Sequence, residues 1–360
     1  MSDKTKIGWS DASWPVVTGC THLSEGCDNC YAAKLTSGRL KHLPAYRGLA
    51  ENGKFSGQVR MLPDRLNWPA KWRKPRRIFV SDMADLFHEG VPDGYIARVW
   101  DVMGRNQQHT YQILTKRHAR LRSWLRRWAD QEGDRASDKP SGMPPMPRGP
   151  EAVRAAYSSG RARLFADMLD SMGTPPEGCA YPLYDWMEGW RFWGRDLLNV
   201  HVGVSAENQK WYDIRWKALA DAPAAVRFIS AEPLLGPIDL GLDHAGHASD
   251  DVNGLPNIRI CMDCSAGEGE AEVPAYFRPG QPKPDWVVAG GESGPGHRPM
   301  QMAWLESIAN QCRMASIPLF VKQDSGPRAG QQGRIPDDIW ALKQFPGDIP
   351  AVPEAVAAHG

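Results

Sequence analysis

Residues 14–32 read WPVVTGCTHLSEGCDNCYA, and this stretch carries the most information in the chain. Its apolar start, Trp14 to Val17, is typical of a strand, and the polar, glycine-containing segment after it marks the carboxyl end of that strand. Cys20, Cys27 and Cys30 follow within one loop. Glycines relax the backbone of such a loop, so that three sulfur atoms can converge on one point.

Three thiolates can hold an iron-sulfur cluster or a metal ion while one coordination position stays open for chemistry. Zinc is the main alternative. A structural zinc site normally has four protein ligands, and His22 is the only further candidate close to the three cysteines. The spacing therefore favours a cluster over zinc, and zinc over inert buried thiols.

The composition indicates an intracellular protein. The chain has 360 residues, a formal net charge of +1 and seven cysteines. An odd number of cysteines, clustered in sequence, argues against a disulfide framework and for a reducing compartment. No apolar run reaches the length of a membrane span, and the first ten residues are polar, unlike a signal peptide. We expect a cytoplasmic protein with no membrane partner.

Short β-branched or aromatic runs alternate with helical patterns along the chain. After the strand before Cys20, strands are expected at 77–80, 110–114, 199–204, 226–229, 286–289 and 319–321, and helices at 95–103, 117–131, 208–220 and 303–314. This alternation is typical of parallel strands with helical crossovers. The predicted fold is α/β, a partial or full parallel (β/α) barrel of about six to seven strands.

Two insertions interrupt this pattern. We expect a first part of the barrel with the cysteine loop (1–128), an insertion made of a flexible loop and a helical cap (129–196), the continued barrel (197–240), an insertion with a metal site (241–284), the end of the barrel (285–345) and a C-terminal tail (346–360).

Polar groups follow almost every predicted strand. In a parallel barrel the active site lies at the carboxyl ends of the strands, so one rim would collect these groups around the cysteines. The exits read Gly19-Cys20, Ser81-Asp82, Thr115-Lys116, Ser205-Ala206-Glu207-Asn208, Ser230-Ala231-Glu232-Pro233, Gly290-Gly291-Glu292-Ser293 and Lys322-Gln323-Asp324. Loops are polar in general, but that rule does not account for carboxylates and lysines at most of these exits.

The chain resembles the radical S-adenosylmethionine (SAM) superfamily and, within it, an uncharacterised phage-type three-cysteine family. The likeness covers roughly residues 7–345 without the insertions. It rests on the cysteine loop with Asn29-Cys30-Tyr31-Ala32, on Ser81-Asp82-Met83 with Asp85-Leu86-Phe87-His88, and on Gly290-Gly291-Glu292-Ser293-Gly294-Pro295. The first gap between the cysteines is longer than in the usual superfamily signature.

The resemblance implies a [4Fe-4S] cluster bound by Cys20, Cys27 and Cys30, with SAM at the open iron. Reductive cleavage of SAM would yield a 5'-deoxyadenosyl radical that abstracts hydrogen from a substrate. A reducing partner such as flavodoxin or ferredoxin is then required. By position in the superfamily, Ser205, Glu207 and Asn208 correspond to a ribose-binding motif, and Ser81 and Asp82 correspond to the exit that holds the SAM amino group.

Several further polar residues are candidates for the same site. Gly290 and Gly291 would let the backbone approach the cofactor closely, beside Glu292. Lys116, Glu232 and Lys322 are candidate catalytic residues, and Arg298 is a candidate for the SAM carboxylate. Each of these charged residues has an alternative interpretation as a member of a structural ion pair.

A second pair of cysteines lies in the insertion at 241–284. Cys261 and Cys264, with His244 and His247, have the residue types of a tetrahedral zinc site in an unusual order. A redox pair, unligated thiols and an auxiliary iron-sulfur cluster are the alternatives.

Basic residues are interleaved with tryptophans in two segments, which suits contact with phosphates and stacking on bases. One comprises Arg60, Arg65, Lys71, Arg73, Lys74, Arg76 and Arg77 with Trp68 and Trp72; the other comprises Arg117, Arg120, Arg122, Arg126 and Arg127 with Trp124 and Trp128. In the second segment the core-like spacing of the apolar residues favours a solvated basic face. We expect nucleic acid or a nucleotide as substrate, in DNA modification or lesion repair.

Two other functions stay open. The protein could be a nucleic-acid-binding module that is braced by a metal or cluster and does not turn over SAM. It could also be a metal-dependent hydrolase or nuclease on a barrel, with Asp82, Asp85, His88, Glu232 and Glu292 as ligands.

Overall fold

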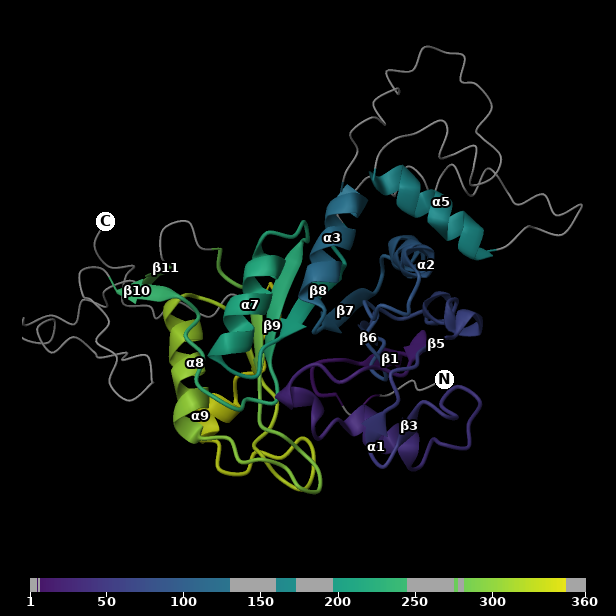
Figure 1. Cartoon of the computed structure of the whole chain (residues 1–360). Coiled ribbons are helices and arrows are strands. Elements are labelled where there is room, and N and C mark those ends of the chain that lie inside the picture. The colour runs from purple at the N-terminus through teal and green to yellow at the C-terminus, as the bar shows by residue number, and fades with distance from the viewer. Residues whose placement is uncertain are drawn as a thin grey trace, which may run out of the picture. The chain divides into compact units, whose positions relative to one another are not determined.

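The structure is a computed structural model that describes residues 5, 7–129, 160–172, 197–244, 275–277 and 282–347 (Figure 1). The chain divides into two compact units. The first unit consists of Met1–Val204 with Lys217–Val226, and the second unit consists of Ser205–Trp216 with Arg227–Gly360.

The first unit begins with small elements around the cysteines and continues with alternating strands and helices. In chain order they are β1 (Ala12–Trp14), β2 (Val17–Thr18), the 3-10 turn η1 (Glu25–Cys27), α1 (Tyr31–Ser37), β3 (Ala50–Glu51), β4 (Lys54–Phe55), β5 (Arg60–Met61), η2 (Pro63–Arg65), η3 (Pro69–Lys71), β6 (Arg77–Val80), α2 (Asp93–Arg105), β7 (Thr110–Thr115), α3 (His118–Ala129), α5 (Gly160–Met172) and β8 (Val200–Ser205).

Four strands of this unit form parallel pairs in the order β1-β6-β7-β8, which is also their order along the chain. Val80 of β6 pairs with Ile113 of β7, and Ile113 pairs with Val202 of β8. All three side chains are buried, and as register partners they lie on one face of the sheet, which is therefore covered. The carboxyl ends of β6 and β7 therefore lie side by side.

The strand predicted at 14–17 is displaced in the structure. The parallel strand β1 ends at Trp14, and Val17 and Thr18 form a separate strand, β2, that pairs antiparallel with β5. Pro15 lies between them and has no N–H to donate to a ladder, so the chain leaves the sheet there. The apolar run was recognised correctly, but its assignment to one strand was wrong.

Helices α2, α3 and α5 pack together in the first unit (Figure 1). The rings of Trp100 in α2 and Trp124 in α3 lie 4.5 Å apart, and Trp124 stacks on Trp128 at 5.5 Å. Gly94 permits the crossing of α2 and α5, because a Cβ there would lie 1.9 Å from the carbonyl oxygen of Asp167. The tryptophans of α3 thus belong to the core.

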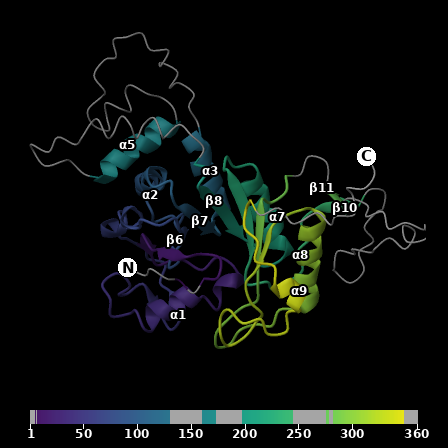
Figure 2. The same cartoon turned by 180° about the vertical axis from the view of Figure 1, so that it is seen from behind.

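The second unit contains three further parallel strands in the order β9-β12-β13. Helix α8 provides the crossover from β12 to β13 (Figure 2). In chain order, the elements of the second unit are α7 (Gln209–Ala220), whose last residues belong to the first unit, β9 (Val226–Ala231), β10 (Leu242–His244), β11 (Ala275–Phe277), β12 (Trp286–Ala289), α8 (Met302–Met314), β13 (Leu319–Val321) and α9 (Asp337–Trp340).

The predicted parallel α/β fold is confirmed, with seven parallel strands and described helices in every connection between them except that from β9 to β12. The strands expected at 77–80, 286–289 and 319–321 have the predicted bounds. Among the helices of the described ranges, none combines the length and the apolarity needed to cross a membrane.

Candidate cysteine-loop site

The cysteine loop starts directly after β2 and is fixed at Gly19. This residue has a φ of +89°, and a Cβ at this position would lie 2.1 Å from the carbonyl oxygen of Gln58. The Gly19 N–H donates to the carbonyl oxygen of Met83, 3.3 Å away and just beyond the end of β6. Only glycine combines this conformation with this close approach, so the loop is held between two neighbouring segments.

Cys20, Cys27 and Cys30 are free thiols and are partly exposed. Burial raises the pKa of Cys20 to about 12, and burial also raises the pKa of Cys30 above its usual range. The charge of Cys27 adds to the rise in both pKa values. The N–H groups of Ala32 and Ala33, at the start of α1, oppose this shift by donating to Cys30.

The surroundings of the cysteines suit a site with three thiolate ligands. Backbone N–H groups donate to Cys30, and the guanidinium of Arg117 donates to Cys20. Within the described ranges, however, no group of three or more His, Cys, Asp or Glu side chains is placed to hold a metal ion. The residues thus suit a cluster by type and by electrostatic surroundings, although the side chains of the described residues do not form a closed coordination shell.

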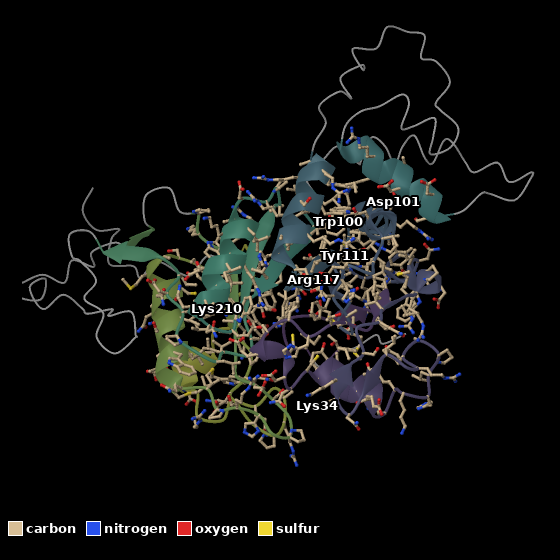
Figure 3. All side chains as sticks on the ribbon, in the orientation of Figure 1. Lys34, Trp100, Asp101, Tyr111, Arg117 and Lys210 are labelled. Carbon is tan, nitrogen blue, oxygen red and sulfur yellow. The ribbon has the colours of Figure 1, made fainter. Side chains whose placement is uncertain are left out.

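Arg117 is the cation of this site, and it follows the end of β7 by two residues (Figure 3). Its side chain is only 4% exposed. Nη1 lies 3.7 Å from Sγ of Cys20 and 3.0 Å from Oδ2 of Asp85, and Nε lies 3.0 Å from Oε2 of Glu89. Nη2 is buried and has no hydrogen-bond partner among the described residues. The guanidinium therefore connects the carboxylates to the cysteine loop.

Asp85 anchors this arrangement from the carboxyl end of β6. Its Oδ1 accepts hydrogen bonds from Thr115 Oγ1 at 2.7 Å and from the Phe87 N–H at 2.9 Å. Its Oδ2 accepts hydrogen bonds from the Lys116 N–H at 3.1 Å and from Arg117. Both carboxylate oxygens are occupied, so Asp85 would have to give up these bonds to become a metal ligand.

His88 fixes the residue next to Cys20. Its Nδ1 accepts a hydrogen bond from the Gly90 N–H at 3.0 Å, and its Nε2 lies 2.7 Å from Thr21 Oγ1. Burial lowers the pKa of His88, so the neutral ring carries its proton on Nε2 and donates to Thr21. In this tautomer His88 cannot take a proton from Thr21, which excludes an activated threonine nucleophile in this geometry.

Ser81 and Asp82 lie beside the cysteine loop, as the sequence predicted. Ser81 has a φ of +60°, and its buried Oγ has no partner among the described residues. Burial raises the pKa of Asp82 to about 6, and its buried Oδ1 is likewise without a described partner. The hydroxyl of Tyr31 donates to the Asp82 carbonyl oxygen at 2.5 Å and so connects α1 to this strand end. Their role toward the SAM amino group stays a prediction.

Lys116 directly follows β7, and its N–H donates to Oδ2 of Asp85 at 3.1 Å, the oxygen that also binds Arg117. In the second unit the predicted residues form ion pairs. Lys322 Nζ lies 3.0 Å from Oε1 of Glu232, and Arg298 binds both oxygens of Glu292 at 2.6 and 3.1 Å. These contacts bring the ends of β9, β12 and β13 together within that unit.

A side chain would be tightly packed at Gly290 and would not fit at Gly291. A Cβ at Gly290 would lie 3.2 Å from Oε1 of Glu232, and a Cβ at Gly291 would lie 2.3 Å from the Ser325 nitrogen. The two glycines thus allow close packing of strand ends within the second unit. Their predicted approach to a cofactor stays a prediction.

The predicted ribose-binding residues are engaged within the chain. Glu207 is fully buried and pairs with Arg215 at 2.9 Å, and the Ser205 carbonyl oxygen accepts a second bond from Arg215 at 2.8 Å. Asn208 Oδ1 accepts the Trp211 N–H at 3.3 Å at the start of α7. These contacts favour structural roles; ribose binding stays a prediction.

The predicted zinc site lies mostly outside the described residues. His247, Cys261 and Cys264 fall there, and of His244 only the backbone is described, paired with Ala275 between β10 and β11.

The sequence pattern did not identify Arg117 as a site residue, because it lies directly before the basic residues of α3 and was grouped with them. Its position in Thr115-Lys116-Arg117, directly after a buried strand, is the signal that could have identified it.

These features define a parallel α/β protein with a three-cysteine loop at the carboxyl ends of its strands. A family model described as "Protein of unknown function (DUF5131)" matches residues 4–336, and the chain belongs to this family. No curated protein and no solved structure matches the chain.

Proposed function

We propose that this protein is a radical SAM enzyme in which Cys20, Cys27 and Cys30 hold a [4Fe-4S] cluster. The observation that carries the proposal is the set of three free thiols in one loop, with the buried guanidinium of Arg117 at 3.7 Å from Cys20. Three cysteine ligands leave the fourth iron open to SAM. When bound, the cluster supplies the electron for reductive cleavage of SAM, from which hydrogen abstraction follows.

The surrounding residues have definite tasks in this proposal. Arg117 places a positive charge beside the Cys20 sulfur, and the Ala32 and Ala33 N–H groups donate hydrogen bonds to Cys30. Such donors favour thiolates and stabilise negative charge on a cluster. The Gly19 backbone is bound to Met83 and the Thr21 side chain is bound to His88, which limits the movement of Cys20. A reduced flavodoxin or ferredoxin would supply the electron.

The decisive experiment is electron paramagnetic resonance (EPR) of anaerobically purified, dithionite-reduced protein, with and without SAM. We expect a [4Fe-4S] signal that SAM perturbs, together with iron and sulfide in cluster stoichiometry. Replacement of Cys20, Cys27 or Cys30 by alanine should lower the iron content strongly.

Cys312 provides the matched control. It is a free cysteine buried in α8, outside the loop, and Cys312→Ala should retain the cluster and the SAM-dependent change in the spectrum. A protein that stays free of cluster after reconstitution and instead contains one zinc ion would overturn the proposal and favour the binding module.

A further inference from the structure

The segment directly after Cys30 is unusually basic. Residues 31–60 contain six lysines or arginines and a single acidic residue, Glu51, whereas the whole chain has 43 basic and 42 acidic residues. Arg39, Lys41, Arg47 and Lys54 are exposed, and none of them forms an ion pair in the described part of the chain. We call these four residues the basic surface.

The arginines of α3 behave differently. Arg120 and Arg127 pair with Asp93, and Arg122 and Arg126 pair with Asp221. All four arginines are thus engaged by carboxylates, which neutralise half of their charge, and the tryptophans of the helix are buried. The second basic segment of the sequence is thus a poor candidate for phosphate binding, in contrast to the basic surface.

The basic surface is held close to the cysteine loop. Arg60 pairs with Thr18 in the β2–β5 ladder, two residues before Cys20. The Arg60 guanidinium donates to the carbonyl oxygens of Pro44 at 2.7 Å and Arg47 at 3.1 Å. Thr18 Oγ1 donates to the Ala45 carbonyl oxygen at 2.6 Å. The segment that carries Arg39, Lys41 and Arg47 is thus fixed against the strand that leads into the loop.

Exposed apolar side chains accompany these charges. Five large hydrophobic residues are exposed in the described part of the chain, and three of them, Leu23, Tyr31 and Leu43, lie in the cysteine loop, at the start of α1 and in the basic segment. Tyr31 is 48% exposed, and its hydroxyl is bound to the Asp82 carbonyl oxygen. Its ring is therefore a fixed aromatic face directly after Cys30, suited to stacking on a base.

We propose that the basic surface and Tyr31 bind single-stranded nucleic acid and present it to the cysteine loop. Lysines and arginines follow a phosphate backbone, and an aromatic face stacks on an unpaired base of any sequence. A base inside a duplex cannot stack on Tyr31 without leaving its pair. Single-stranded nucleic acid is then the substrate class of the proposed enzyme. Chemistry on the nucleic acid rests on the proposed function, but its binding to this surface does not.

The test is fluorescence anisotropy with a labelled DNA 20-mer, single-stranded and as the corresponding duplex, over a series of salt concentrations. The full-length protein should bind the single strand more tightly than the duplex, with an affinity that falls as salt rises. The variant Arg39→Gln, Lys41→Gln, Lys54→Gln should weaken binding by about tenfold and reduce the slope of log K against log salt by about 2, as expected for three lost phosphate contacts on a single strand.

Lys71→Gln, Arg73→Gln, Lys74→Gln is the matched control. These three residues are also exposed and form no ion pair with any residue that the structure describes, but they precede the amino end of β6, the end opposite to the cysteine loop. This variant loses the same charge and should bind nearly as the parent does. Tyr31→Ala should weaken binding without a change in the salt slope, because stacking involves no phosphate.

Equal losses in the two triple variants, preference for the duplex or binding that does not respond to salt would each overturn the inference. Iron content and EPR spectra of the same preparations separate it from the proposed function. A SAM-sensitive cluster without nucleic-acid binding leaves the enzyme proposal standing, and salt-dependent single-strand binding without a cluster leaves only the binding surface.

Discussion

Nη1 of Arg117 lies 3.7 Å from Sγ of Cys20, and the same guanidinium is bound to the buried carboxylate of Asp85 at 3.0 Å. The ends of β6 and β7 thereby place a shared cation beside the first cysteine of the loop. Through this contact, the fold of the first unit fixes a positive charge beside a thiol that is proposed to bind the cluster.

Arg117→Met should lower the midpoint reduction potential of the reconstituted cluster, because the positive charge that favours the reduced form is removed. We expect a shift of about 60 mV, equivalent to about a tenfold change in a one-electron equilibrium. A redox titration followed by EPR measures it. Arg105→Met, which removes an arginine paired with Asp101 on the surface of α2, is the control and should leave the potential unchanged.

Loss of Arg117 also leaves Asp85 buried without its cation, so the folding of the variant must be verified. The double variant Arg117→Met, Asp85→Asn removes the uncompensated charge and should recover part of the stability. A potential equal to that of the parent in both the single and the double variant would contradict an electrostatic role of Arg117.

Gly19→Ala should destabilise the protein and lower its iron content. The substitution combines a left-handed conformation with a Cβ only 2.1 Å from the Gln58 carbonyl oxygen. Gly48→Ala is the matched control, because Gly48 has a φ of +77° but nothing within 4 Å of its Cβ position. Gly48→Ala should cost about 1–2 kcal/mol of unfolding free energy from the backbone alone. Urea denaturation should give a clearly larger loss for Gly19→Ala; similar losses would exclude the steric contact as the cause.

Asp82 should make stability depend on pH. Burial raises its pKa from 3.8 to about 6, so the folded protein binds a proton there that the unfolded chain releases between these values. The protonated Asp82 contributes fully to the free energy of unfolding below about pH 4. This contribution, about 3 kcal/mol, is lost as the pH rises through about 6. The variant Asp82→Asn has no titrating group at this position and does not lose this contribution. The difference in free energy of unfolding, variant minus parent, should therefore increase from pH 4 to pH 7. Parallel stability curves of the two proteins would show that Asp82 does not titrate as described.

Glu207 should contribute to stability through its ion pair with Arg215. It is fully buried with Arg215, so Arg215→Met leaves an uncompensated charge and should cost about 3–5 kcal/mol. The double variant Glu207→Gln, Arg215→Met removes that charge and should recover much of the loss in urea denaturation. If ribose binding were its role, Glu207→Gln would instead weaken the SAM-dependent change of the EPR spectrum while leaving stability nearly intact.

Local pattern determined most of the strands and helices. Residues 286–289 and 319–321 are apolar runs bounded by polar or turn residues, and they form β12 and β13 with the predicted bounds. The same applies to α8, predicted at 303–314 and observed from Met302 to Met314. These elements follow from side-chain periodicity, which neighbours in sequence already define.

The local sequence pattern did not predict where the first strand ends or which basic residues form ion pairs. Pro15 divides one apolar run into β1 and β2, because the sheet requires a donor that proline lacks. The arginines of α3 have the same sequence character as Arg39 or Lys41, yet they pair with Asp93 and Asp221, residues remote in the sequence. Which basic residues remain available for a ligand depends on such distant partners.

The sequence by itself determined the parallel α/β class, the three-cysteine loop and the polar strand ends, because these depend on residue type and short spacings. The tertiary structure decided that Arg117 lies beside Cys20, that Glu207 is bound by Arg215, and that the segment carrying most of the basic surface is fixed to the strand before the cysteine loop. Each of these facts requires two segments to meet in space, and the meeting is set by strand order and packing, which no short stretch of residues encodes alone.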